Sequence, residues 1–119
     1  MSVTLEEFEQ FINQAIAQVP AQIQAAIKNV AFVVDDQQLG DHRGWLLGQY
    51  RGIPLTRRGA GYSGVLPDKI TIYKKTIEQV AGDDPEKIKN QAIATVHHEI
   101  AHYFGFNETE VRRWEKKRQ

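Results

Sequence analysis

His98-Glu99-Ile100-Ala101-His102 is the stretch of this sequence that decides the fold, because it combines two histidines at helical spacing with an acid between them. Side chains at positions i and i+4 project from the same face of a helix, so the two imidazoles can reach one cation. Glu99 directly follows His98 and projects from an adjoining side of the helix, where it can reach a water bound to the metal. The pattern therefore predicts a metal centre on a helix.

The residues after the second histidine extend this pattern. Gly105 comes three residues after His102, and Glu108 comes six residues after it. Glycine adopts positive φ readily and ends helices, so the chain can turn back and offer a further ligand to the same ion. A catalytic zinc site has three protein ligands and one open position. We therefore predict that His98, His102 and Glu108 bind Zn²⁺.

The third ligand has competitors in the sequence. Glu108 also suits the first turn of a following helix, where an acid complements the helix dipole. Glu110 and His42 are the main alternatives to it as a ligand. His97 is placed differently, because consecutive residues project about 100° apart around a helix. We expect His97 to pack or to make a supporting hydrogen bond, since it and His98 do not comfortably share one ion.

Tyrosine is the residue type that could complete the predicted chemistry. Tyr62, Tyr73 and Tyr103 are each expected to be aromatics of the core or its rim. A phenol close to the metal could also stabilise an oxyanion. The sequence does not choose among the three.

The composition of the chain is ordinary for a globular protein. Of its 119 residues, 41% are hydrophobic and 25% are charged, and a chain of this length can bury a core without covalent staples. We predict a single domain over residues 1–119. Fifteen basic and fifteen acidic side chains cancel, so no net charge draws the protein to nucleic acid or to an anionic membrane.

Cysteine is missing from the sequence, which excludes disulfides and thiolate ligands. Nitrogen and oxygen atoms must therefore hold the metal. The N-terminal segment has no basic region followed by an apolar stretch, and no apolar run approaches membrane-spanning length. We expect a cytoplasmic protein.

Capping residues predict where the first helices begin. Thr4 and Glu7 form a capping-box pattern, followed by apolar residues at helical spacing up to Pro20. Proline is tolerated at the start of a helix, so a second short helix can begin there. Three strands are expected downstream, at residues 30–34, 45–50 and 69–73, and the first of them reads as buried on both faces.

The motif lies on the longest predicted helix. Asp84-Pro85 combines an N-cap residue with a proline at the first helical position, and the helix should run to about Phe104. A short helix over residues 76–80 precedes it, and Asn107 can cap a last helix. One stripe of the motif helix should anchor it, formed by Ile88, Ala92, Thr95, Val96, Glu99 and Tyr103.

The chain resembles the small zincin-like metallopeptidases of bacteria, which are described as minimal zincins. The resemblance rests on the segment from His98 to Glu108 and on two earlier segments, Ile53-Pro-Leu-Thr-Arg-Arg-Gly59 and Tyr62-Ser-Gly-Val-Leu-Pro-Asp68. It implies an α+β, zincin-like fold in which a small mixed sheet packs against the motif helix, with additional N- and C-terminal helices. It also implies zinc bound by two histidines and a downstream acid, and hydrolysis of peptide bonds.

The sequence departs from the larger zincins at three points. Glu108 stands where metzincins have a histidine, and no methionine follows it to form a Met-turn, since Met1 is the only one. We also expect no large C-terminal subdomain. We therefore expect a substrate cleft that is shallow or is completed by a protein partner.

Together these observations predict a zinc metallopeptidase, a hydrolase in which Glu99 is the general base that activates water for attack on a peptide bond. The expected substrate is a peptide or an unstructured protein. Strand 69–73, if it lies at the sheet edge, could hold that substrate by strand addition. The alternative is a zinc-stabilised binding or adaptor module with little or no turnover. Both hypotheses require zinc, but only the enzyme requires Glu99.

Overall fold

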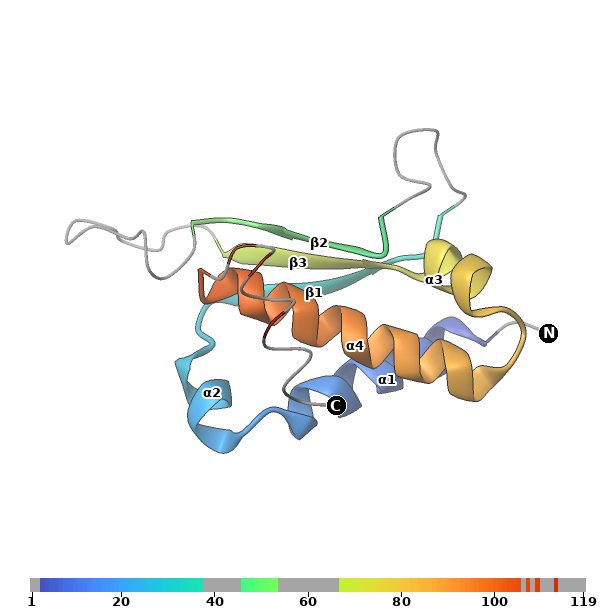
Figure 1. The fold of residues 1–119 in the computed structure, drawn as a ribbon, viewed down its shortest axis with the longest axis horizontal. Coiled ribbons are helices and arrows are strands. Elements are labelled where there is room, and N and C mark those ends of the chain that lie inside the picture. Colours follow the sequence, from blue (N-terminus) through green and yellow to red (C-terminus); the bar gives the residue numbers. More distant parts are fainter. Residues whose placement is uncertain are drawn as a thin grey trace.

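The computed structural model describes residues 3–37, 46–53 and 67–105, together with residues 107, 109 and 113. Figure 1 shows the strands forming one layer, with two long helices packed beneath it. In chain order the elements are α1 (Leu5–Gln18), α2 (Ala21–Ala26), β1 (Val30–Asp35), β2 (Gly48–Arg51), β3 (Asp68–Tyr73), α3 (Lys74–Ala81) and α4 (Pro85–Tyr103). The order of helices and strands agrees with that predicted from the sequence.

β3 is the central strand of a three-stranded mixed sheet, in the order β1-β3-β2. β1 runs parallel to β3, with Val30 opposite Asp68, whereas β2 runs antiparallel to it, with Gly48 opposite Ile72. The predicted α+β fold is confirmed, because this small mixed sheet packs against the motif helix α4. The idea that strand 69–73 forms a sheet edge is wrong. β3 is paired on both sides, and β2 is the edge strand that lies beside α4.

Other elements cover only one face of β1, whereas the sequence predicts a strand that is buried on both faces. Val30, Phe32 and Val34 pack against the hydrophobic core. Val33 points to the opposite side of the sheet, because side chains alternate along a strand, and it is 38% exposed. α1 and α4 both lie on the core side of the sheet (Figure 1). A run of β-branched residues indicates a strand, but it does not show how many faces other elements cover.

α1 and α4 begin where their capping residues predict. The Glu7 backbone N–H donates to Thr4 Oγ1 at 3.1 Å, and the Thr4 N–H donates to Glu7 Oε1 at 2.9 Å, which completes a capping box. The Glu86 N–H donates to the Asp84 carboxylate at 3.0 Å, and Pro85 is the first helical residue. None of the described helices combines the length and apolar character needed to cross a membrane.

The predicted C-terminal helix lies largely outside the described residues. Within it the structure describes Asn107, Thr109 and Arg113, and the last two have helical backbone. Trp45, at the start of the predicted second strand, also lies outside the described residues, and β2 begins at Gly48.

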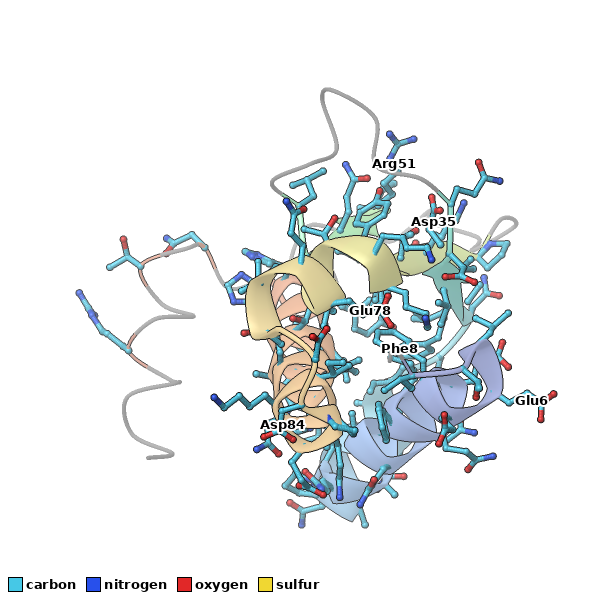
Figure 2. All side chains as sticks on the ribbon, turned by 90° about the vertical axis from the view of Figure 1, so that its right-hand side faces the viewer. Glu6, Phe8, Asp35, Arg51, Glu78 and Asp84 are labelled. Carbon is cyan, nitrogen blue, oxygen red and sulfur yellow. The ribbon has the colours of Figure 1, made fainter. Side chains whose placement is uncertain are left out.

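The core fills the space between the sheet and the two long helices. Figure 2 shows Phe8 of α1 directed into this space, whereas Glu6 of the same helix points outward. Burying a large apolar side chain stabilises the fold by roughly 1.5–3 kcal/mol, so these contacts fix α4 against the sheet. The buried members include Phe8, Ile12 and Ala15 of α1, Ile70 and Ile72 of β3, Ile77 of α3, and Ile88, Ala92, Val96 and Ile100 of α4.

Candidate metal centre

His98 and His102 lie one turn apart on α4, and their imidazoles meet. The two Nε2 atoms are 3.3 Å apart, and the ring centroids are 4.9 Å apart with planes inclined by 68°. Both side chains are half-buried. The rings therefore direct two nitrogen atoms toward one point beside the helix, in agreement with the spacing of the motif.

The separation of these nitrogens fits a tetrahedral zinc ion. Two nitrogens bound at roughly 2.0–2.1 Å in a tetrahedral arrangement lie about 3.3–3.4 Å apart. His98 and His102 have this separation already, and imidazole nitrogen is a ligand type that suits zinc. No group of three candidate ligands occurs within the described part of the chain. Glu108, Glu110 and His42 lie outside it, so the third ligand stays a prediction.

The motif helix ends directly after the second histidine. Tyr103 is its last residue, and Gly105 has a φ of 95°, a left-handed conformation that glycine adopts without steric cost. The Gly105 N–H donates to the His102 carbonyl at 2.9 Å, which closes the last turn. The predicted sharp end of the helix is confirmed. Glu108 follows three residues later in the sequence.

Glu99 occupies a buried position of α4 beside the half-buried histidines. It is 7% exposed and packs against β2, where a Cβ atom added to Gly48 would lie 3.2 Å from Glu99 Cγ. The acid is thus held between the motif helix and the edge strand of the sheet. The other members of the predicted anchoring stripe are also buried, namely Ile88, Ala92, Thr95, Val96 and Tyr103.

His97 faces the first helix of the protein. Its side chain is buried, and its Nε2 lies 2.8 Å from the carbonyl oxygen of Ala15 in α1. A carbonyl oxygen only accepts hydrogen bonds, so Nε2 is the donor. The predicted packing role of His97 is confirmed. Adjacent histidines therefore have different surroundings, because His97 contacts α1 whereas His98 contacts His102.

Two of the three candidate tyrosines have hydroxyl groups engaged in structural contacts. The Tyr103 hydroxyl donates to the Lys28 carbonyl at 3.1 Å and accepts from the Lys28 N–H at 3.2 Å. The Tyr73 hydroxyl donates to Gln49 Oε1 at 3.0 Å, across the β3–β2 pair. Tyr62 lies outside the described residues. The geometry of Tyr73 and Tyr103 thus favours the expected role of core and rim aromatics.

The surroundings of the site depend on residues of β2 and β3 that sequence analysis missed. The Tyr50 hydroxyl donates to Asp68 Oδ2 at 2.6 Å, and the Tyr50 ring meets the Tyr103 ring edge-on at a centroid distance of 6.0 Å. The hydrogen bond joins β2 to β3, and the ring contact joins β2 to the end of α4. Gly48, nearer the middle of α4, was also missed. A glycine within a strand often marks a close approach of backbone to another element, and this signal could have identified it.

Comparisons with known proteins agree with this geometry. A family model described as zincin-like metallopeptidase matches residues 27–118, a range that includes the sheet and the motif helix. The chain is also similar to a solved structure, a conserved hypothetical protein from Thermus thermophilus, with 21% identity and a TM-score of 0.57 over 84% of this chain and 92% of that chain. This likeness concerns the fold alone. No curated protein matches the chain. Because the family match spans most of the sequence, the chain belongs to the zincin-like metallopeptidase family.

Proposed function

We propose that this protein is a zinc-dependent metallopeptidase in which His98, His102 and Glu108 hold the metal and Glu99 is the general base. The observation that carries the proposal is the convergence of the two Nε2 atoms at 3.3 Å, on a helix that also carries the buried Glu99 directly after His98. Membership of the zincin-like metallopeptidase family supports the same assignment.

The roles follow from where each side chain lies. When bound, zinc would supply a Lewis acid that polarises the scissile carbonyl and makes water more acidic. Glu99 follows His98 in the sequence and is held on the β2 side of α4, so its carboxylate can accept a proton from the attacking water. The same carboxyl group can then deliver that proton to the leaving amine. Glu99 would act in this way without being a metal ligand.

The edge strand β2 is our candidate for holding the substrate. Within the described sheet it pairs on one side, with β3, and it runs beside α4. An extended peptide can add to a sheet edge through main-chain hydrogen bonds, which recognise backbone and not particular side chains. We therefore propose a peptide or an unstructured protein segment as the substrate. β2 takes the role that the sequence suggested for strand 69–73.

Replacing Glu99 with Gln tests the proposal, because it keeps the size of the side chain and removes its basicity. Zinc-loaded wild type and Glu99→Gln would be incubated with a library of unstructured peptides, and cleavage followed by mass spectrometry. We expect wild-type turnover and a loss of about 10²–10⁴-fold in the variant, which is the usual worth of general acid–base catalysis. Equal cleavage by both proteins would contradict the mechanism.

Zinc content provides the control for this experiment. Glu99→Gln should bind as much zinc as the wild type, because Glu99 is not proposed as a ligand. A wild type that binds zinc and cleaves nothing in the library would favour the alternative function, a zinc-stabilised adaptor module. In that case candidate protein partners that could complete the cleft would be added one at a time to the same assay.

A further inference from the structure

Gly48 lies where β2 packs closely against Thr95 and Glu99 of α4. A Cβ atom added there would lie 2.7 Å from Thr95 Cγ2 and 3.2 Å from Glu99 Cγ. It would also lie 3.2 Å from the backbone carbonyl oxygen of Thr71 in β3. Carbon atoms in contact are ordinarily about 3.5–4.0 Å apart. Even the smallest side chain at this position would therefore push β2 and α4 apart or displace Glu99.

Thr95 cannot easily turn aside to make room. Its hydroxyl donates to the Gln91 carbonyl at 2.8 Å and accepts from Gln91 Nε2 at 3.3 Å, and the residue is buried. A threonine in a helix has few χ1 rotamers, and these hydrogen bonds select one of them. In that rotamer Cγ2 is the Thr95 atom closest to the Gly48 position. Rotating it away would break hydrogen bonds in a buried place.

We infer that Gly48 is a positioning residue for Glu99. Because it has no side chain, β2 can close onto α4 and confine the Glu99 side chain against the strand. The inference rests on the proposed function of Glu99 and adds to it a residue outside the motif. Gly48 would act through Glu99 and would not contact the metal ligands, so zinc binding should not depend on it.

The test compares the wild type with Gly48→Ala, Thr95→Ser and the double variant. Thr95→Ser removes Cγ2, the atom at 2.7 Å, and keeps the hydroxyl that bonds Gln91. The position of Glu99 is followed by its side-chain carboxyl ¹³C resonance in the full chain, with and without zinc, and assigned with Glu99→Gln. Turnover and zinc content are measured on the same four proteins.

Gly48→Ala should shift the Glu99 resonance and lower kcat by about 10- to 100-fold, since small displacements of catalytic groups cost rates of this order. Its zinc content should equal that of the wild type. The double variant should regain much of the resonance position and of kcat, and Thr95→Ser alone should resemble the wild type. If Gly48→Ala does not fold, the proposal requires that the double variant does.

Two results would overturn the inference, namely an unchanged Glu99 resonance in folded Gly48→Ala and a double variant that fails to fold. A shifted resonance that Thr95→Ser does not restore would still support the inference, and it would assign the displacement of Glu99 to its own 3.2 Å contact with the added Cβ atom. If the wild type cleaves no peptide, the proposed enzymatic function fails. The resonance comparison would still decide whether Gly48 positions Glu99.

Discussion

His97 Nε2 donates a hydrogen bond of 2.8 Å to the carbonyl oxygen of Ala15, which links the motif helix to α1. Ala15 lies in the last turn of α1, where carbonyls have no partner within the helix. Gln24 of α2 bonds other carbonyls at this end of α1. Its side-chain amide donates to the Val19 carbonyl at 2.7 Å and to the Ala17 carbonyl at 3.4 Å. Side chains from two later helices thus complete the C-terminus of α1.

Replacing His97 with Ala should destabilise the protein without removing the metal. The variant leaves the Ala15 carbonyl without its imidazole partner in a buried place, which costs about 1–3 kcal/mol in the free energy of unfolding, and the lost ring volume adds to this. Urea denaturation of the metal-free protein measures the change. The matched control is His97→Gln, whose amide can still donate and should recover part of the loss. His97→Ala with wild-type stability would show that the hydrogen bond contributes little.

Local signals account for what the sequence predicted correctly. The Thr4–Glu7 capping box and the Asp84-Pro85 start place α1 and α4 through interactions within a few residues. The spacing of His98 and His102 determines their proximity in the same way, because the geometry of one helix turn is fixed. These features do not depend on how the sheet is assembled.

The features that sequence analysis missed depend on contacts between distant segments. The central position of β3 is set by its pairing with both β1 and β2. The exposure of Val33 is set by which face of the sheet the helices cover. Likewise, the role of Gly48 follows from the meeting of β2 with α4. Alternating hydrophobicity and β-propensity predict a strand, but they do not predict which strands or helices it will contact. The third metal ligand, Glu108, lies outside the described residues and stays a prediction.

Acid should weaken the start of α1 through Glu7. Hydrogen bonds from the Thr4 backbone N–H, and secondarily from its side chain, lower the pKa of Glu7. The pKa of Glu7 is therefore lower in the folded state than in the unfolded state. The stability that Glu7 contributes is fully present above the unfolded pKa of about 4.3, and it is lost as the pH falls through the folded pKa. Glu7→Gln should therefore be less stable than the wild type at neutral pH, and the difference should shrink in acid.

Thermal unfolding from pH 7 down to about pH 3, on either side of the ordinary glutamate pKa, measures this difference. Glu6→Gln is the matched control, because Glu6 belongs to the same first turn and points away from the molecule (Figure 2). Its substitution removes one negative charge near the helix dipole and leaves the capping box in place. A Glu7→Gln difference that is constant with pH, or no larger than that of Glu6→Gln, would argue against the capping box as its source.

Removing either imidazole of the convergent pair should abolish zinc binding. The wild type purified without chelator should carry about one zinc per chain, as a single site implies, whereas His98→Ala, His102→Ala and the double variant should carry almost none. Zinc binds the native state, so it should also raise the thermal midpoint of the wild type and not that of the variants. His97→Ala is the internal control and should retain its zinc. Full metal content in the double variant would exclude this site.

Glu108 should complete the metal site, and substituting it should separate ligand loss from helix loss. The left-handed Gly105 ends α4 with a φ of 95°, so the chain leaves the helix just before Glu108. We expect Glu108→Ala to weaken zinc affinity strongly in competition titrations with a chromogenic chelator. Glu108→Gln should weaken it too, because a neutral amide oxygen is a poorer zinc ligand than a carboxylate.

Glu110→Ala and His42→Ala are the comparisons that make the Glu108 test decisive. Glu110 lies two residues further along the predicted last helix, so its loss should lower helix stability and leave zinc affinity near that of the wild type. His42→Ala should have no effect on the metal. If Glu108→Ala binds zinc as the wild type does while one of these two variants does not, the third ligand is that other residue. The histidine pair and Glu99 would then keep their proposed roles, because neither role depends on which residue supplies the third ligand.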